Sequence, residues 1–197
     1  DISEISLGSD VLISPNEQTN ITLNYTQIST LEKGKLFREF FAEAEYRGIP
    51  NWTIEGGVQY LEFNKEVYQV VPGAGILYAF TPFAELTYKI NIKKSIRTEF
   101  QYMNTKQDYG SWLFALVEYN IAPKLSFALS DMYNISPNPE LASKANHYYN
   151  CFVAYTKGAN RYTAAFVKQV EGINCTGGVC RYEPAFSGFK IGITSSF

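Results

Sequence analysis

The side chains that could carry out chemistry begin with a single histidine, His147. A histidine base beside a serine and a carboxylate or amide would support nucleophilic hydrolysis, and Ser143, Asp131 and Asn150 lie near it in sequence. However, His147 stands where a loop meets an extended segment, a position typical of a structural aromatic residue. We therefore expect no enzymatic activity, and a hydrolase that uses His147 is the second alternative.

Two of the three cysteines form a tight unit. Cys175 and Cys180 enclose Thr-Gly-Gly-Val, and the two glycines permit the sharp turn that so short a ring needs. We predict a disulfide between them, and hence an oxidising compartment. The pair lacks the two further ligands of a zinc site, and we expect neither a metal nor a cofactor. Cys151 lies in an extended segment, as a small buried or lipid-facing residue.

Charged residues recur on one side of the alternating segments, opposite the apolar residues. A set of this kind either lines a selective pore or pairs within a closed or plugged interior. We favour paired charges, because the signs are mixed. The predicted interior charges are Glu39, Glu43, Glu45, Glu55, Glu85, Lys89, Arg97, Glu99, Arg161 and Lys190.

Extended segments must position these residues, because period-two alternation dominates the chain and helical periodicity is nearly absent. Aromatic residues are abundant, with 15 Tyr and 14 Phe among 197 residues, and the net charge is −2. No basic patch indicates nucleic acid as a partner. Proline, glycine, asparagine and aspartate divide the chain into about eleven segments: 4–13, 20–29, 36–47, 52–63, 77–90, 95–104, 112–119, 125–133, 147–156 and two more within 161–197.

The length of the segments indicates a membrane-spanning sheet. Strands of ten or more residues suit a tilted bilayer crossing, and short connections alternate with longer ones. We therefore predict an all-β, antiparallel, up-and-down transmembrane β-barrel with about 11–12 strands visible, as one domain over residues 1–197. Eleven strands would place the two ends on opposite sides, whereas bacterial barrels have even strand counts, so we expect the C-terminal part of a larger barrel.

Aromatic residues near the ends of the segments are predicted to form membrane-interface girdles. Alternation alone does not distinguish this arrangement from a soluble, lipocalin-like ligand-binding barrel, in which the apolar face would point inward, and that fold is the first alternative. The predicted girdle residues are Tyr46, Trp52, Tyr60, Tyr88, Tyr102, Trp112, Tyr119, Tyr133, Tyr149, Tyr155 and Tyr162.

Residues 52–197 resemble a large family of outer-membrane β-barrel proteins from the Bacteroidota, most specifically in the run Asn-Cys-Thr-Gly-Gly-Val-Cys-Arg-Tyr at 174–182. The resemblance implies an outer-membrane location and a longer protein, and brings no catalytic residues. We therefore expect a non-enzymatic structural, porin-like transport or complex-forming component. Its partners would be outer-membrane lipid or lipopolysaccharide and other outer-membrane proteins. The Cys175–Cys180 loop would be extracellular and Phe197 periplasmic.

Overall fold

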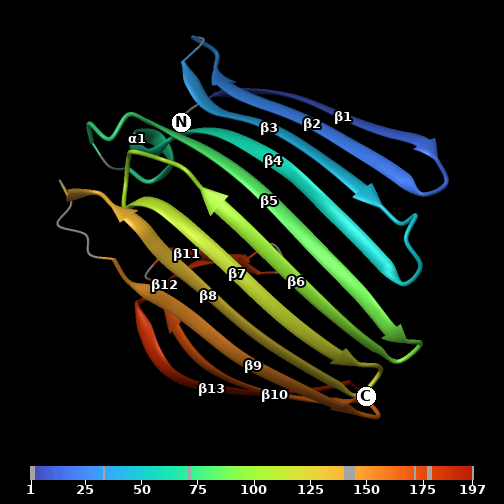
Figure 1. Ribbon diagram of the computed structural model, residues 1–197. Helices are drawn as coiled ribbons and strands as arrows, with labels where there is room; N and C mark the ends of the chain where they lie inside the picture. Colours follow the sequence, from blue (N-terminus) through green and yellow to red (C-terminus); the bar gives the residue numbers. More distant parts are fainter. Residues whose placement is uncertain are drawn as a thin grey trace.

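The computed structural model describes residues 3–32, 34–70, 72–139, 145–170, 172–176 and 179–196, with the backbone alone over 172–183. Nearly all regular structure is strand (Figure 1). The elements are β1 (Glu4–Asn16), β2 (Thr19–Thr30), β3 (Lys35–Tyr46), β4 (Trp52–Asn64), α1 (Lys65–Tyr68), β5 (Ile76–Asn91), β6 (Lys94–Met103), β7 (Gly110–Ile121), β8 (Leu125–Pro137), β9 (His147–Lys157), β10 (Asn160–Gln169), β11 (Gly172–Thr176), β12 (Val179–Glu183) and β13 (Phe186–Ser195).

Eleven of the strands form one antiparallel sheet in which each strand pairs with the next along the chain. The order is β1 to β10 followed by β13, and β11 and β12 form a separate hairpin inserted before the last strand. The four longest connections, at 65–75, 104–109, 138–146 and 170–185, all lie at one end of the strands. The predicted all-β, antiparallel, up-and-down architecture is confirmed.

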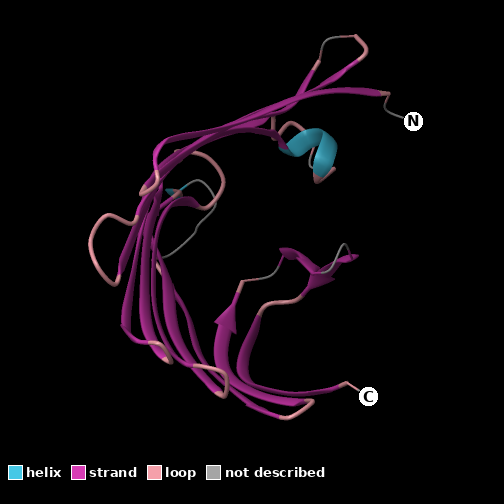
Figure 2. Ribbon diagram, turned by 90° about the vertical axis from the view of Figure 1, so that its right-hand side faces the viewer, coloured by secondary structure: helices cyan, strands magenta, loops and turns pink. Residues whose placement is uncertain are grey.

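The sheet is curved but open. β1 pairs only with β2, and β13 pairs only with β10, within the residues that the structure describes. Figure 2 shows the strands in a C-shaped arc whose two ends face each other across a gap. The sequence predicted a barrel that the last strand helps to close, and these eleven strands by themselves do not close it.

A single sheet without a second layer leaves most of its surface accessible. The accessible area is 13195 Å², whereas a globular monomer of 22.3 kDa exposes roughly 9,400 Å². Among the described residues, the fully buried apolar side chains are Leu36, Ala79 and Ala154. The apolar residues of the strands therefore have no protein core to enter.

The long connection between β4 and β5 contains a short helix that the sequence pattern did not predict. The side chain of Asn64 caps α1 by accepting a hydrogen bond from the backbone N–H of Val67 at 3.1 Å. The ring of Tyr68 stacks on Phe63 with centroids 5.2 Å apart. Burial, and then the negative charge of Glu4, raise the pKa of Tyr68. Figure 2 shows α1 and the β11–β12 hairpin on the inner side of the arc.

Candidate functional site: two opposite faces of one curved sheet

The outer, convex face of the sheet is largely apolar, although by register it also carries the Arg38–Glu62 ion pair at the long-connection end of β3 and β4. The strand register places apolar residues of neighbouring strands side by side, as in the row that joins Val117, Leu129 and Cys151. These side chains are exposed rather than packed: Leu129 is 61 % exposed and Phe100 is 52 % exposed. The convex face is therefore a continuous apolar surface that no described part of the chain covers.

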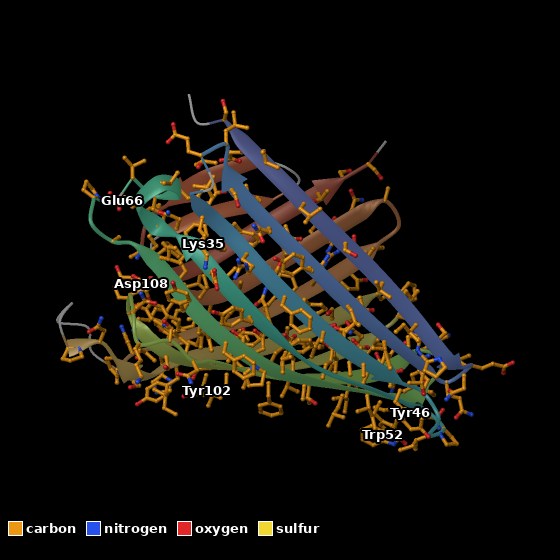
Figure 3. All side chains as sticks on the ribbon, turned by 90° about the horizontal axis from the view of Figure 1, so that it is seen from above. Lys35, Tyr46, Trp52, Glu66, Tyr102 and Asp108 are labelled. Atoms are coloured by element: carbon orange, nitrogen blue, oxygen red, sulfur yellow. The ribbon has the colours of Figure 1, made fainter. Side chains whose placement is uncertain are left out.

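Aromatic rings border this surface at both ends of the strands. Figure 3 shows Tyr46 and Trp52 projecting outward at the short-turn end and Tyr102 projecting nearer the long-connection end. Ten of the eleven predicted girdle residues lie on the convex face by register. Six lie near the short turns: Tyr46, Trp52, Tyr88, Tyr119, Tyr155 and Tyr162; four lie toward the long connections: Tyr60, Tyr102, Tyr133 and Tyr149.

Two pairs of rings near the short turns lie close to each other. The ring centroids of Trp52 and Tyr88 are 4.7 Å apart, and those of Tyr155 and Tyr162 are 6.5 Å apart. From Trp52 to Tyr60 on β4 the strand rises about 26 Å at ~3.3 Å per residue. With the ~40° strand tilt of outer-membrane barrels, this rise would correspond to about 20 Å along a barrel axis, close to the ~25 Å apolar band of such barrels.

The eleventh predicted girdle residue, Trp112, lies on the opposite face, so that prediction is wrong. Trp112 pairs in register with Met103 and Asn134, and its ring lies 5.7 Å from that of Tyr148 on the concave side. Trp112 and Tyr119 are seven residues apart in one strand with unbroken register, so alternation places them on opposite faces, and Tyr119 is the one on the convex face. β7 is apolar on both faces, so its sequence did not show which of the two rings faces outward. In a continuously apolar segment, the sequence does not show which side chains point to which face of the sheet.

The concave face carries the charges. All ten predicted interior residues lie on it by register. Four glutamates on the adjacent strands β3 to β6 are direct register partners, in the order Glu45, Glu55, Glu85, Glu99. Like charges placed directly opposite destabilise a sheet, so this row needs a compensating cation or a highly hydrated surface.

Arg97 supplies part of that compensation. Its Nη1 lies 2.7 Å from a carboxylate oxygen of Glu85 and 3.2 Å from one of Glu99, and its Nη2 lies 3.6 Å from Glu118. Arg97, Glu85 and Glu99 line part of a shallow hollow of ≈ 330 Å³. Sequence reasoning missed Glu118, because it lies on the apolar strand β7. The mixed-sign pairing expected for the interior charges is present around Arg97, within a row that is otherwise acidic.

An aromatic platform adjoins the glutamate row on the concave side. The rings of Phe41 and Phe83 stack with centroids 5.6 Å apart, and Phe83 extends over Gly57. A Cβ atom at Gly57 would lie 2.2 Å from the carbonyl oxygen of Ala42 and 2.7 Å from the Phe83 ring. Gly57 therefore provides the space in which this ring lies flat on the sheet.

Gly57→Ala is expected to destabilise the protein by about 1–3 kcal/mol, because the added methyl group overpacks against backbone and ring. Gly56→Ala is the matched control: it lies on the other face, and its Cβ would meet its nearest neighbour at an ordinary 3.6 Å. Urea denaturation of both variants measures the difference. Equal midpoints for the two variants would contradict the proposed role of Gly57.

His147 and Asp131 form a polar pair within the convex aromatic belt, on β9 and β8 respectively. Nδ1 of His147 lies 2.6 Å from a carboxylate oxygen of Asp131, and Tyr133 stacks on the imidazole with centroids 4.3 Å apart. Within the described residues no serine or threonine hydroxyl bonds to this ring, and Ser143 lies outside them. In the described part of the chain, His147 is thus oriented by Asp131 and stacked on Tyr133, with no hydroxyl nucleophile bonded to it.

The remaining predicted sites are partly described. Cys175 and Cys180 are direct backbone partners in the β11–β12 hairpin, but their side chains lie outside the described residues, and so does Phe197. Cys151 is an exposed free thiol on the convex face, so the buried position that was one of its two predicted alternatives is wrong. No group of three potential metal ligands occurs in the described part of the chain.

No helix among the described residues is both long and apolar enough to cross a membrane. Comparison with curated proteins yields no match, and neither does comparison with solved structures. A protein family matches the chain over residues 7–197, which is nearly its whole length. By that match, the chain belongs to the family of unknown function DUF6029.

Proposed function

We propose that this protein is an integral outer-membrane β-barrel component of a Gram-negative, Bacteroidota-like bacterium, with a structural, transport or complex-forming role and no enzymatic activity. One observation carries the proposal: the apolar face of the curved sheet is the convex one, and the charged face is the concave one. A lipocalin-like barrel would have the opposite polarity, because its apolar face must line the ligand cavity. Lipid is the solvent that suits an uncovered apolar band between two aromatic belts.

The two tryptophans provide a direct test, because they lie on opposite faces of the sheet. In bilayers of brominated phosphatidylcholine, Trp52 is expected to be quenched strongly because it faces lipid. Trp112 is expected to be quenched weakly because it faces the lumen. The variants Trp112→Phe and Trp52→Phe isolate each signal, and each serves as the control for the other.

Equal quenching of the two variants would contradict the proposed orientation. A protein that remains monodisperse in buffer without detergent, with neither tryptophan quenched, would exclude the membrane location and support the soluble alternative. Quenching of Trp112 alone would invert the assignment of the faces. Each outcome is read from the ratio of emission in brominated and ordinary lipid.

We also propose that Cys175 and Cys180 form a disulfide within the β11–β12 hairpin. Direct partners in an antiparallel pair have Cα atoms about 4.5–5.5 Å apart, within the range that disulfides span. Intact mass after alkylation of the unfolded, unreduced protein is expected to show one modified thiol, that of Cys151. Reduction before alkylation is expected to add two more. Three modified thiols without reduction would refute the disulfide.

A further inference from the structure

The two edge strands of the sheet are long, and each is unpaired along one side. β1 has 13 residues and β13 has 10, and neither has a second strand partner among the described residues. Their convex side chains are strongly exposed: Leu7 is 63 % exposed and Ile191 is 83 % exposed. Each edge therefore presents an unpaired row of backbone N–H and C=O groups beside apolar side chains.

On their convex sides neither edge is protected against pairing; the charges Glu4, Asp10 and Lys190 lie on the concave side, and Pro15 lies at the turn end of β1. Soluble sheets protect an edge with charged side chains, prolines, bulges or a covering element. The convex side of β1 has Ile5, Leu7, Val11 and Ile13 without a charge, and its register shift lies only at the turn end, after Ile13. β13 continues the same apolar surface with Phe189, Ile191 and Ile193. Both strands have the pattern of an interior strand of a larger sheet.

The direction of the strands restricts what can pair with these edges. Eleven successive antiparallel strands place β1 and β13 in the same direction. If β1 paired directly with β13, the junction would be parallel in an otherwise antiparallel sheet. A second copy in the same membrane orientation would create the same parallel junction. An antiparallel closure needs an odd number of strands between the two edges.

We propose that β1 and β13 are bridged by an antiparallel β-meander with an odd number of strands, contributed by polypeptide outside residues 3–196 and not by a second copy of them. The inference rests on the proposed membrane location, since only a membrane forces copies into one orientation. The meander continues the apolar convex face with alternating residues.

Charge on the concave side further defines the meander. β1 presents Glu4 and Asp10 on this side, and β13 presents Lys190. Asp10 already accepts a hydrogen bond from Asn24, and Lys190 donates one to Gln169, so Glu4 is the charge that bears on the meander. The strand beside β1 is expected to carry a basic or amide side chain next to Glu4. Pairs of this kind across strands contribute roughly 0.2–1 kcal/mol each and help to set the register.

Photo-crosslinking in the native membrane tests the proposal. Benzoylphenylalanine is introduced as Leu7→benzoylphenylalanine or Val11→benzoylphenylalanine on β1, and as Ile191→benzoylphenylalanine on β13. Leu129→benzoylphenylalanine on the interior strand β8 is the matched control, because Leu129 is similarly exposed on the convex face. Cells that contain isotopically light and heavy copies are irradiated, and the adducts are identified by mass spectrometry.

Both edges are expected to crosslink to peptides outside residues 3–196. These peptides come either from two strands, the first and the last of an odd-numbered meander, or from one strand that both edges share. Crosslinks between β1 and β13 of one copy, mixed light–heavy crosslinks, or lipid adducts alone at the edges would each overturn the proposal. Lipid adducts at Leu129 report the membrane location separately. Their absence would refute the proposed function whatever the edges show.

Discussion

Leu129→Arg is expected to lower retention of the protein in the membrane more than any other single change considered above. Leu129 lies on the convex face in the middle of β8, in register with Val117 and Cys151 and between the two aromatic belts. An arginine at the lipid-facing midplane of an outer-membrane barrel costs about 2–4 kcal/mol. The measurement is the fraction of protein that stays in the membrane pellet at increasing urea concentration, together with the unfolding midpoint.

Ser130→Arg is the matched control, because Ser130 is adjacent on the same strand but lies on the concave face. Its arginine is expected to enter a hydrated lumen and to change the midpoint little. In a soluble protein the ranking would reverse: an arginine at the exposed Leu129 would be within about 0.5 kcal/mol of neutral. A Leu129→Arg variant that folds and fractionates like the parent would therefore refute lipid contact at this face.

Arg97→Met is expected to lower the free energy of unfolding by about 2 kcal/mol. Breaking a fully buried ion pair costs more, about 3–5 kcal/mol, but the side chain of Arg97 is 33 % exposed, so solvent screening reduces the effect. The substitution leaves Glu85, Glu99 and Glu118 without their shared cation. Urea unfolding at low and high ionic strength measures the loss, which salt is expected to diminish.

Lys89→Met is the control for net charge, because Lys89 also lies on the concave face but has no salt bridge among the described residues. The double variant Arg97→Met/Glu85→Gln is expected to recover part of the stability, because it removes one of the stranded carboxylates. If the Arg97 and Lys89 variants lose equal stability, the effect comes from overall charge. The arrangement around Arg97 would then contribute nothing specific.

Strand positions and facing were largely predictable from the sequence, because period-two alternation fixes both at once. β4, for example, was predicted at 52–63 and spans Trp52–Asn64. Facing was not predictable where the alternation is lost: β7 is apolar on both faces, so its sequence did not show whether Trp112 or Tyr119 faces outward, nor that Glu118 faces Arg97. The four-residue helix α1 and the β11–β12 hairpin were predicted only as loops, because they are too short to show a period.

The functional contacts were less predictable than the fold. Alternation placed the glutamates on one face, but whether Glu45, Glu55 and Glu85 lie level with one another depends on turn lengths and register. The sequence named Asp131 as a possible partner of His147, and the β8–β9 register brings the two together. Alternation did not show whether the sheet closes; the expectation of a larger barrel came from the odd number of strands.

Sequential pairing has a consequence for how such a chain reaches its structure and how it can change in length. Every pairing in the large sheet except that of β10 with β13 joins strands that are consecutive in the chain. Contact order is therefore low, and closing each short connection costs little chain entropy. Each hairpin can form with its own strand register and then pair with the hairpin that precedes it in the chain. A descendant can also gain or lose one hairpin, which changes the circumference by two strands and preserves the direction of all the others.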